Sequence, residues 1–516
     1  MYFMTIDAGT GSIRAVIFDT LANQISIAQR EWTHLSEDGV ANSMGFDYKK
    51  NWQLCVTCIK EAVFKAGIRA SEIAAISATS MREGIVVYDS DKNELFGVAN
   101  VDARAAKEVT EINRRYPELE REFYDISGQT FALGALPRLM WLKHNRPAIY
   151  EKVAHINMIS DWVLTKLSGV IAAEPSNAGT SGIFSLKNRK FEPSMAKKLG
   201  IKDDIFPTVY ESGTVIGNIS KKASDETGLH VSTKVVMGGG DVQLGSAGLG
   251  IVKEGESAIL GGTFWQQIVN IKADRVDPKM NIRINPHVIS GLSQAEGITF
   301  FSGMLMGWFR DTFCDMEKLE AKKMGIDTYE YLESLAAKIP VGSYGIMPIF
   351  SDVMKYSRWY HAAPSFINLS LQNTSKAAMF RSLQENAAIV SMLNLNNIMK
   401  FTKTSGESIT FAGGASKGKL WSQILSDVTG KSIKIPLVNE ATALGGAFAA
   451  GVGAGEYGSI EEVAKSLVQW DKTYEPDMQN YKRYQEIAHQ WQEIYDTQLK
   501  LVDKNLTTAM WSAPGL

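Results

Sequence analysis

Hydrophobic and polar residues near the N-terminus follow the pattern of β-strands. Apolar runs occupy residues 3–6 and 13–18 with a glycine-rich turn between them, and apolar residues alternate with polar ones around Ile25 and Ile27. Alternation with a period of two and short apolar runs bounded by turn residues are typical of strands. The N-terminus is therefore predicted to form a β-meander.

Helical spacing begins after the meander and alternates with a further strand. Apolar residues recur every three or four positions over 52–65, a short apolar run covers 74–78, and helical patterns return around 105–115 and 136–144. Strands interleaved with helices indicate a sheet that is covered by helices. The predicted fold class is α/β.

The second half of the chain begins with a similar pattern. Residues 257–271 place a strand, a Gly-Gly-Thr turn and another strand, directly after the glycine-rich segment 235–252. Glycines let backbone segments approach closely, so 235–252 is predicted to line a cleft between two lobes. A chain of 516 residues also exceeds what one hydrophobic core usually organises. The predicted domains are residues 1–248 and 249–516.

The C-terminal third has the outline of a nucleotide site. A strand ends at Phe411 before a glycine turn, and a helix with an apolar face from Leu420 to Val428 is stopped by Gly430. A strand over 433–435 then leads to the small-residue segment 440–455. This last segment is predicted to form a helix that packs closely on a neighbour or a ligand.

Composition and charge favour a small-molecule partner. Hydrophobic residues make up 45% of the chain and charged residues 21%, and the formal net charge is −2. Nucleic acids and anionic membranes normally need a clustered basic excess, so neither is expected as a partner. The N-terminus resembles no signal peptide, and no apolar run is long enough to span a membrane. The predicted location is cytoplasmic.

The cysteines predict packing rather than chemistry. Cys55 and Cys58 form a C-x-x-C and Cys314 is the third cysteine of the chain. The pair lies inside the predicted helix 52–65, and no second C-x-x-C or suitably spaced histidine pair completes a tetrahedral site. Cys55 and Cys58 are therefore predicted to be small core residues in a reducing compartment.

The turn between the first two strands combines a carboxylate, glycines and hydroxyls. The sequence DAGTGS places Asp7 at the strand end, followed by Thr10, Gly11 and Ser12. Backbone N–H groups and hydroxyls in such a turn suit phosphate oxygens, which a carboxylate repels unless a cation lies between them. The Mg²⁺ that accompanies a nucleotide resolves this conflict. The alternative is an ordinary glycine-rich hairpin with a solvated aspartate.

Two more glycine turns follow strands in the second half. Gly262 and Thr263 repeat the strand–Gly–Thr arrangement, while Gly413 and Gly414, with Lys417, precede a helix whose N-terminus attracts anions. Each turn alone is compatible with a plain strand connection. Their order along the chain favours ATP held between two lobes, with these residues at the nucleotide.

Asp241 is the candidate catalytic base. It follows three consecutive glycines in GGGDVQLG, where the backbone can approach a ligand. A lone aspartate is often a cap or turn former, but a phosphoryl-transfer site also needs a carboxylate that accepts the proton of the substrate hydroxyl. Asp241 is predicted to be this base and to contact the substrate. It is also a candidate ligand of the metal ion.

Substrate contacts are predicted after two short strands. Arg82 and Glu83 in SMREG place a donor beside an acceptor, and Asp102 and Arg104 in NVDAR repeat the pairing. Polyhydroxylated molecules need such mixed partners. The alternative for both pairs is ion pairing at the surface.

Two other motifs are rejected on the sequence. Gly413-x-x-x-x-Gly418-Lys419 resembles a P-loop, but Leu420 stands where the magnesium-binding hydroxyl belongs. The G-x-S-x-G around Ser416 resembles a hydrolase nucleophile elbow. His489 is the one histidine after Ser416, and it lies in an amphipathic helix where a surface or packing role is expected.

The stretches DAGTGSIRAVIFD, GGGDVQLG, LGGTFWQQ and FAGGASKGKLWSQILSDVTG together resemble the FGGY family of carbohydrate kinases, from the first strand nearly to the C-terminus. The resemblance implies two actin-like, ribonuclease-H-like α/β domains with a catalytic cleft between them, and ATP with Mg²⁺ as cofactors. It implies that Asp7 holds magnesium through water and that Asp241 is the base. Thr10 and Thr263 would contact the transferring phosphates, Gly413 and Gly414 would border the adenosine, and Arg82 and Glu83 would hold substrate hydroxyls.

Within the family, SMREGIVVY, NVDARAA and WYHAAPSFINLS resemble the members that act on autoinducer-2. The implied substrate is its open-chain form, 4,5-dihydroxy-2,3-pentanedione, phosphorylated on the terminal hydroxyl. The resemblance also raises a phosphocarrier protein as a partner. Gly11 stands where glycerol kinases carry a second threonine, which leaves the share of Ser12 in phosphate binding open. The alternatives are a kinase for pentuloses or other sugars and a non-catalytic actin-like nucleotide-binding protein.

Overall fold

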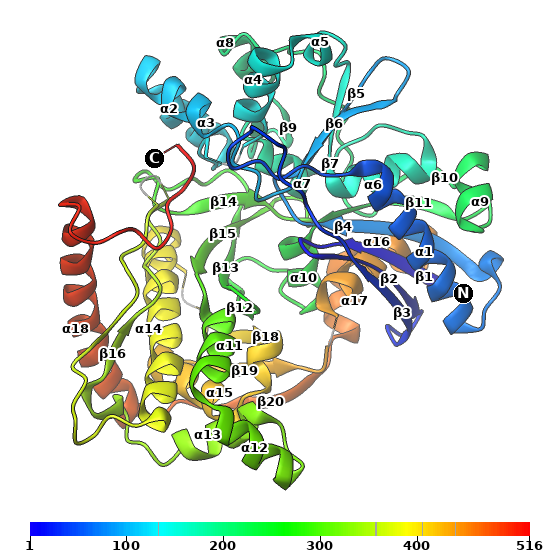
Figure 1. Ribbon diagram of the computed structural model, residues 1–516. Helices are drawn as coiled ribbons and strands as arrows, with labels where there is room; N and C mark the ends of the chain where they lie inside the picture. The colour runs from blue at the N-terminus through cyan, green and yellow to red at the C-terminus, as the bar shows by residue number, and fades with distance from the viewer. Residues whose placement is uncertain (133, 357–358, 405, 439, 516) are drawn as a thin grey trace.

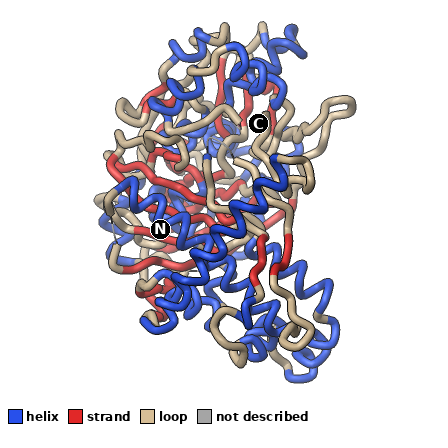
Figure 2. The backbone as a smooth tube through the Cα atoms, turned by 90° about the vertical axis from the view of Figure 1, so that its left-hand side faces the viewer, coloured by secondary structure: helices blue, strands red, loops and turns tan. Residues whose placement is uncertain are grey.

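Two large sheets, one from each half of the chain, form the centre of the molecule (Figure 1). The computed structural model describes residues 1–132, 134–356, 359–404, 406–438 and 440–515. Figure 2, turned by 90°, shows the strands running between helices. None of the helices in these ranges is long and apolar enough to cross a lipid bilayer.

The first sheet has six strands in the order β10-β11-β4-β1-β2-β3. Its antiparallel meander is the one that the apolar pattern predicts, and β4 and β11 join it in parallel. Met4 and Ile6 pack toward α1 and α6, whereas Phe3 and Val16 pack toward α10 and α16 on the opposite face. The strands are β1 (Tyr2–Ala8), β2 (Ser12–Asp19), β3 (Gln24–Glu31), β4 (Ile73–Ser80), β10 (Val215–Asn218) and β11 (Lys234–Gly240), and the helices are α1 (Tyr48–Ala66), α6 (Ile159–Ser168), α9 (Lys221–Thr227), α10 (Asp241–Gly248) and α16 (Ala441–Ala454).

The second sheet has seven strands in the order β14-β15-β13-β12-β18-β19-β20. It also starts from an antiparallel meander, and β18 pairs with β12 in parallel as β4 does with β1. Helix α14 packs against β13 and β15 and lies beside α15. The elements are β12 (Ser257–Gly261), β13 (Trp265–Lys272), β14 (Arg283–Pro286), β15 (Leu292–Thr299), β18 (Ser408–Ala412), β19 (Ser432–Pro436), β20 (Trp470–Tyr474), α14 (Lys376–Thr402), α15 (Lys419–Thr429) and α18 (Met478–Asp503).

Helices α10 and α16 join the two halves by unusually close packing. A Cβ atom on Gly445 would lie 1.9 Å from the carbonyl oxygen of Leu244, and one on Gly248 would lie 2.0 Å from that of Ala441. Only glycine fits at such distances, because a real Cβ needs more than 3 Å. Helix α16 belongs to the second half of the sequence but covers the first sheet, with Gly446 against Thr5. The small-residue composition of 440–455 thus serves a helix–helix and helix–sheet contact, as predicted.

A smaller layer sits above the first sheet (Figure 1). Its three strands are β6-β5-β7, and helices α2 to α4 pack with them around one core. The bounds are β5 (Ile85–Tyr88), β6 (Glu94–Val98), β7 (His155–Met158), α2 (Ala106–Arg115), α3 (Leu119–Ser127), α4 (Ala135–Asn145), α5 (Pro147–Tyr150), α7 (Pro175–Ala178), β8 (Phe184–Ser185), β9 (Lys190–Phe191) and α8 (Pro193–Lys198). In the second half, the remaining elements are α11 (Ser302–Phe313), α12 (Asp315–Met324), α13 (Thr328–Ala336), β16 (Met347–Ile349), β17 (Ser365–Ile367) and α17 (Ile460–Leu467).

The predicted elements are confirmed, with one addition. Cys55 and Cys58 are fully buried in α1 and act as core residues. Gly430 ends α15 in the left-handed conformation, as predicted. The glycine-rich segment 235–252, for which the sequence predicted only a position lining a cleft, forms β11 and α10, so Asp241 is the first residue of a helix. Its glycines serve the close packing of α10.

Candidate active site

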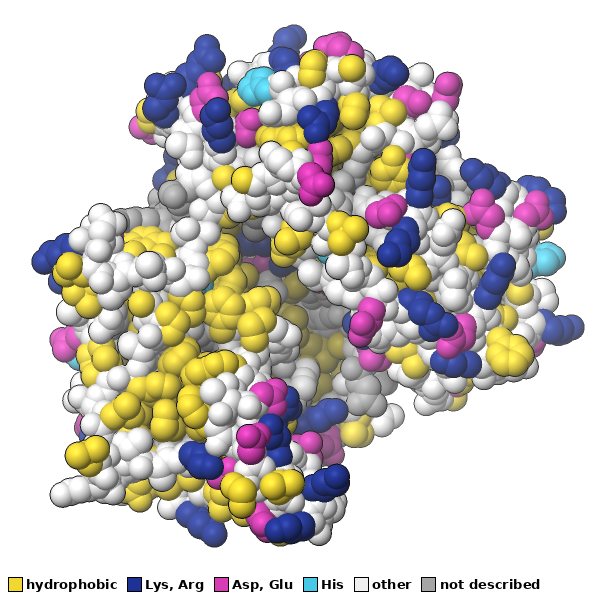
Figure 3. Space-filling view, in the orientation of Figure 1, with side chains coloured by type: hydrophobic (Ala, Val, Ile, Leu, Met, Phe, Trp, Pro, Cys, Tyr) yellow, Lys and Arg dark blue, Asp and Glu magenta, His cyan; other side chains and the backbone are white. Residues whose placement is uncertain are grey.

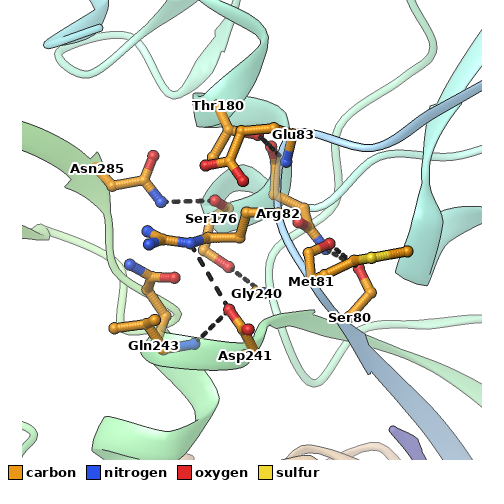
Figure 4. Close-up of polar contacts among 12 residues, drawn as sticks. Ser80, Met81, Arg82, Glu83, Ser176, Thr180, Gly240, Asp241, Gln243 and Asn285 are labelled. Carbon is orange, nitrogen blue, oxygen red and sulfur yellow. Dashed lines mark hydrogen bonds and ion pairs between the residues drawn. The ribbon is translucent and has the colours of Figure 1, made fainter. Parts of the chain in front are cut away.

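Asp241 lies where β11 ends and α10 begins, at the edge of the first sheet that faces the second half. Its side chain is 39% exposed, and one carboxylate oxygen is 3.6 Å from the Nε atom of Arg82. The same oxygen accepts a hydrogen bond from the Val242 N–H at 2.8 Å (Figure 4). Figure 3 shows the surface hollowed between the two halves of the molecule. The carboxylate therefore has one ordered cationic neighbour and an opening for a ligand.

The surroundings of Asp241 bring its pKa close to neutral pH. Burial raises its pKa to about 6, the Arg82 guanidinium opposes that shift, and the carboxylates of Glu83 and Asp7 add to it. General bases work best with a pKa near the operating pH. The arrangement therefore suits Asp241 to accept a proton from a substrate hydroxyl.

Arg82 and Glu83 follow β4, whose parallel pairing with β11 brings them beside Asp241. Arg82 is buried and its Nη1 donates to Glu296 Oε1 at 2.6 Å, an oxygen that Gln243 also contacts at 2.9 Å. Glu83 has a φ of +66°, a left-handed conformation that turns the chain sharply after the strand. Arg82 is thus fixed by a carboxylate on the opposite half of the molecule.

Glu83 pairs with a buried arginine that the sequence did not single out. Its carboxylate accepts a hydrogen bond from Arg283 Nη2, and Arg283 Nε donates to Gln129 Oε1 at 3.0 Å. Burial by itself would raise the pKa of Glu83, but Arg283 and Arg82 outweigh it and hold that pKa below its usual value. Glu83 is therefore an ionised hydrogen-bond acceptor inside the cleft.

Arg138 is a second arginine that sequence reasoning missed. It is fully buried in α4, and its guanidinium donates to the backbone carbonyls of Glu83, Asn100 and Asp102. The Asn100 side chain in turn donates to Thr10 Oγ1 at 3.1 Å. One helix residue therefore ties the turn after β4 to the first hairpin. The helical pattern around it carries no signal of this role, because the contacts are made with distant backbone.

Asp102 and Arg104 are buried and held together by an ion pair. Arg104 Nε lies 2.9 Å from Asp102 Oδ2, and its guanidinium lies over the rings of Phe96 and Trp141 at 5.0 and 4.7 Å. Asp102 also accepts a hydrogen bond from the backbone of Met44. Their side chains are occupied by these partners, and their contact with a substrate stays a prediction from the sequence.

The first hairpin presents Thr10 and Gly11 at an exposed tip, with Ser12 half-buried behind them. Asp7 lies below the tip and is buried, with a carboxylate oxygen 3.1 Å from Arg14 Nη2. Burial raises the pKa of Asp7, and Arg14 opposes the shift. A further cation near the tip would favour its ionised form.

The two glycine turns of the second half lie side by side. Strands β12 and β18 are parallel neighbours, and a Cβ on Gly413, whose φ is +94°, would lie 2.8 Å from the carbonyl oxygen of Gly261. Gly262, Thr263, Gly413 and Gly414 are all exposed. Lys417 is exposed in the short 3-10 turn Gly414–Lys417. Backbone groups from two strand ends are thus free to meet a ligand.

The donor set fits a magnesium ion that is held mainly by a nucleotide. The carboxylates of Asp7 and Asp241 influence each other's charge and supply oxygen, the ligand that Mg²⁺ prefers. Across the described residues, no cluster of three or more His, Cys, Asp or Glu side chains is arranged to bind a metal. In phosphoryl-transfer sites, phosphates and water commonly complete the shell of a Mg²⁺ ion that takes one or two carboxylates.

The hydrolase motif finds no support in the structure. The Ser416 hydroxyl donates to the Gly413 carbonyl of its own turn at 2.8 Å. His489 lies on α18 with its side chain 77% exposed beside Glu493. Neither residue has the partner that a nucleophile and its base require.

Comparison with known proteins shows the family of the chain. The model of the FGGY family of carbohydrate kinases, N-terminal domain, matches residues 2–248, and that of the C-terminal domain matches residues 278–454. A relative from Salmonella typhimurium named "Autoinducer-2 kinase" is 54% identical over 518 residues, which cover 100% of this chain and 98% of the relative.

Solved structures show the same architecture at low identity. A xylulose kinase from Lactobacillus acidophilus superposes with a TM-score of 0.85 at 19% identity, covering 96% of this chain and 98% of that one. A glycerol kinase from Plasmodium falciparum with ADP gives 0.81 at 18% identity, with the same coverage. The predicted fold class, two actin-like α/β domains that face a cleft, is confirmed. The chain belongs to the FGGY family of carbohydrate kinases.

Proposed function

We propose that this protein is an ATP-dependent kinase for autoinducer-2 and phosphorylates the terminal hydroxyl of open-chain 4,5-dihydroxy-2,3-pentanedione. The observation that carries the kinase chemistry is the Asp241 carboxylate at the start of α10, open to the cleft and 3.6 Å from Arg82 Nε. The full-length identity of 54% to a protein named autoinducer-2 kinase supports the substrate.

In this proposal Asp241 accepts the proton of the terminal hydroxyl while that oxygen attacks the γ-phosphorus. The bond from the γ-phosphorus to the β–γ bridging oxygen breaks, and ADP leaves with the electron pair. Arg82 holds the Asp241 carboxylate in place and is itself fixed by Glu296. The ionised Glu83 accepts a hydrogen bond from a substrate hydroxyl, and Arg283 donates to a substrate oxygen. General-base catalysis of this kind typically contributes ~10²–10⁴-fold.

The nucleotide would lie between the hairpin tip and the two glycine turns. Membership in a kinase family implies the use of ATP. Thr10, Gly11 and Ser12 would contact the phosphates from one side and Thr263 from the other, with the second glycine turn and Lys417 at the nucleoside. A bound Mg²⁺ would offset the negative charge of the phosphates. Asp7 would hold this ion through water.

The proposal extends to the roles of the two halves of the chain, the location of the protein and a protein partner. Residues 1–248 would supply the substrate side and the base, and residues 249–516 the nucleotide side. The protein would act in the cytoplasm, where phosphorylation traps the signal molecule inside the cell. A phosphocarrier protein as partner stays a prediction of the family resemblance.

A coupled assay of ATP consumption tests the proposal. The acceptors are glycerol, xylulose, ribulose and 4,5-dihydroxy-2,3-pentanedione, each measured with Mg²⁺ and with an excess of chelator. The highest kcat/KM is expected for the dihydroxydiketone, with loss of activity in chelator. A higher kcat/KM for a pentulose would replace autoinducer-2 by that pentulose as the assigned substrate. ATP consumption that does not depend on any of the acceptors would favour a non-catalytic actin-like protein.

A further inference from the structure

A small cavity lies beyond the Arg82–Glu83 turn and has one polar and one apolar side. Its polar lining consists of Glu83, Gln129, Arg283 and three residues with hydroxyl groups, Thr130, Thr180 and Tyr356, while Ala132, Trp359 and Ala513 contribute apolar surface. Trp359 and Ala513 are almost fully buried. These three apolar residues, here called the apolar wall, come from segments that are far apart in the sequence.

The position of the cavity relative to Asp241 indicates which end of a substrate would enter it. Asp241 contacts Arg82, and the next residue, Glu83, lines the cavity, whereas Asp241 is not among its lining residues. A substrate that places its terminal hydroxyl at Asp241 and extends past Arg82 and Glu83 would reach the apolar wall. The end of the substrate opposite the phosphorylated hydroxyl is the part that would reach this wall.

Ala513 of the apolar wall belongs to a C-terminal segment that contacts both halves of the molecule. The backbone N–H of Ala513 donates to the Trp359 carbonyl at 2.8 Å, and that of His361 donates to the Trp511 carbonyl at 2.8 Å. Beyond this pairing, the Gly515 carbonyl accepts a hydrogen bond from Thr110 on α2 at 3.1 Å. Residues 510–515 are therefore held beside the cavity by hydrogen bonds to Trp359 and His361 in the second half and to Thr110 in the first half.

We propose that the apolar wall is a specificity element that receives the terminal methyl group of the substrate and selects it against a hydroxymethyl group. The inference rests on the proposed function, because 4,5-dihydroxy-2,3-pentanedione ends in a methyl group where xylulose and ribulose carry a hydroxymethyl group. It assigns a role in substrate choice to Ala132, Trp359 and Ala513.

The physical reason is the cost of burying a hydroxyl without a partner. A methyl group gains free energy when it leaves water for an apolar surface. A hydroxymethyl group at the same place loses its hydrogen bonds to water and finds no donor or acceptor on these three side chains, apart from the single indole N–H of Trp359. An apolar pocket typically discriminates against an added hydroxyl by up to ~10²-fold.

The test compares two acceptors that differ only at this group. 1-Deoxy-D-xylulose and D-xylulose have the same terminal hydroxyl, and only the first ends in a methyl group at C1. We expect the kcat/KM of the wild-type protein to be ~10–100-fold higher for the 1-deoxy sugar. Equal values, in a protein that phosphorylates 4,5-dihydroxy-2,3-pentanedione, would overturn this inference and leave the proposed function standing.

A preference for the 1-deoxy sugar without activity on the dihydroxydiketone would also distinguish the two proposals. A strong preference for 1-deoxy-D-xylulose in a protein that fails to phosphorylate the dihydroxydiketone would refute the proposed function and retain the methyl-binding role of the wall. The two proposals therefore fail on different measurements.

Variants on both sides of the cavity locate the effect. A132S and A513S each add one hydroxyl with little change in volume, so the preference for the methyl group should fall at least ~3-fold in each. L506S is the matched control, because it makes an apolar residue polar at a position that is 69% exposed and does not line the cavity. An unchanged preference in both wall variants, with normal unfolding curves, would contradict the assignment.

Discussion

The Nε atom of Arg82 lies 3.6 Å from the carboxylate of Asp241, while Nη1 of the same guanidinium lies 2.6 Å from Glu296. Arg82 therefore joins the candidate base of the first half to a carboxylate of the second half. Because Arg82 is buried and Asp241 is open to the cleft, the arginine can orient the base without covering it. This relationship leads to the first two predictions.

Replacing Asp241 with asparagine should abolish catalysis and spare nucleotide binding. The amide cannot accept the hydroxyl proton, so kcat is expected to fall by at least ~10²-fold. The Kd for ATP, measured by titration calorimetry, should change little. D91N, at an exposed turn of the first half, is the control with normal kcat. Retained turnover in D241N would remove Asp241 from its role as base.

The pH dependence of kcat/KM should show an acidic limb near pH 6. The base must be ionised, and its pKa of about 6 means that the rate falls as the pH drops below that value and levels off above it. The Arg82 guanidinium lowers this pKa, so R82Q should move the limb to higher pH, whereas R82K should keep it closer to the wild-type position. R115Q, at an exposed position on α2, serves as a control. A limb that stays in place in R82Q would contradict the electrostatic coupling.

Breaking the buried pair of Glu83 and Arg283 should destabilise the protein strongly. R283M leaves the Glu83 carboxylate buried without its main partner, which typically costs about 3–5 kcal/mol in the free energy of unfolding. The double variant E83M/R283M should recover much of that loss, because both charges are gone. Urea unfolding measures each value.

The control for this prediction is an exposed ion pair. Lys221 and Asp225 are 81% and 61% exposed, and K221M should leave the unfolding free energy nearly unchanged. If R283M behaved like K221M, the buried pair would have no structural importance.

A methyl group on Gly445 should disturb both stability and catalysis. Its Cβ would lie 1.9 Å from the carbonyl oxygen of Leu244 in α10, the helix that Asp241 begins. G445A is therefore expected to lower the unfolding free energy by about 1–3 kcal/mol and to reduce kcat by displacing the base. G307A is the control: Gly307 lies inside α11 with its nearest neighbour 3.7 Å from the added Cβ, so alanine should fit there. A neutral G445A would show that α10 and α16 can separate freely.

Much of the local structure was predictable because it depends on neighbouring residues. The meander of β1 to β3 follows from the alternation of apolar and polar side chains along its strands. Helix α15 follows from the apolar face of its own sequence, and Gly430 ends that helix. The repeat of the strand–turn–strand pattern at 257–271 likewise indicated the second sheet. The sequence did not reveal that 235–252 forms a strand and a helix, because glycines favour turns locally but here permit close helix packing.

The candidate site was predictable only in part. Asp7, Arg82, Glu83 and Asp241 stand beside glycines or at strand ends, so their positions in the sequence attract attention. Arg138 and Arg283 give no such signal, since each lies in an ordinary helix or strand and contacts residues far away in the chain. Asp102 and Arg104 carry the same signal in the sequence; the structure pairs them with each other, and their contact with a substrate stays a prediction.

The sequence by itself determined the strands, the helices, the two-part organisation and the glycine turns, because these arise from interactions within a few residues and from hydrophobic periodicity. Tertiary structure decided which charged groups share the cleft and which are paired elsewhere. It also placed the wall formed by Ala132, Trp359 and Ala513 next to Glu83. The pKa of Asp241 and the shape of that wall depend on burial and on partners distant in the chain, and neither quantity exists until the two halves have packed together.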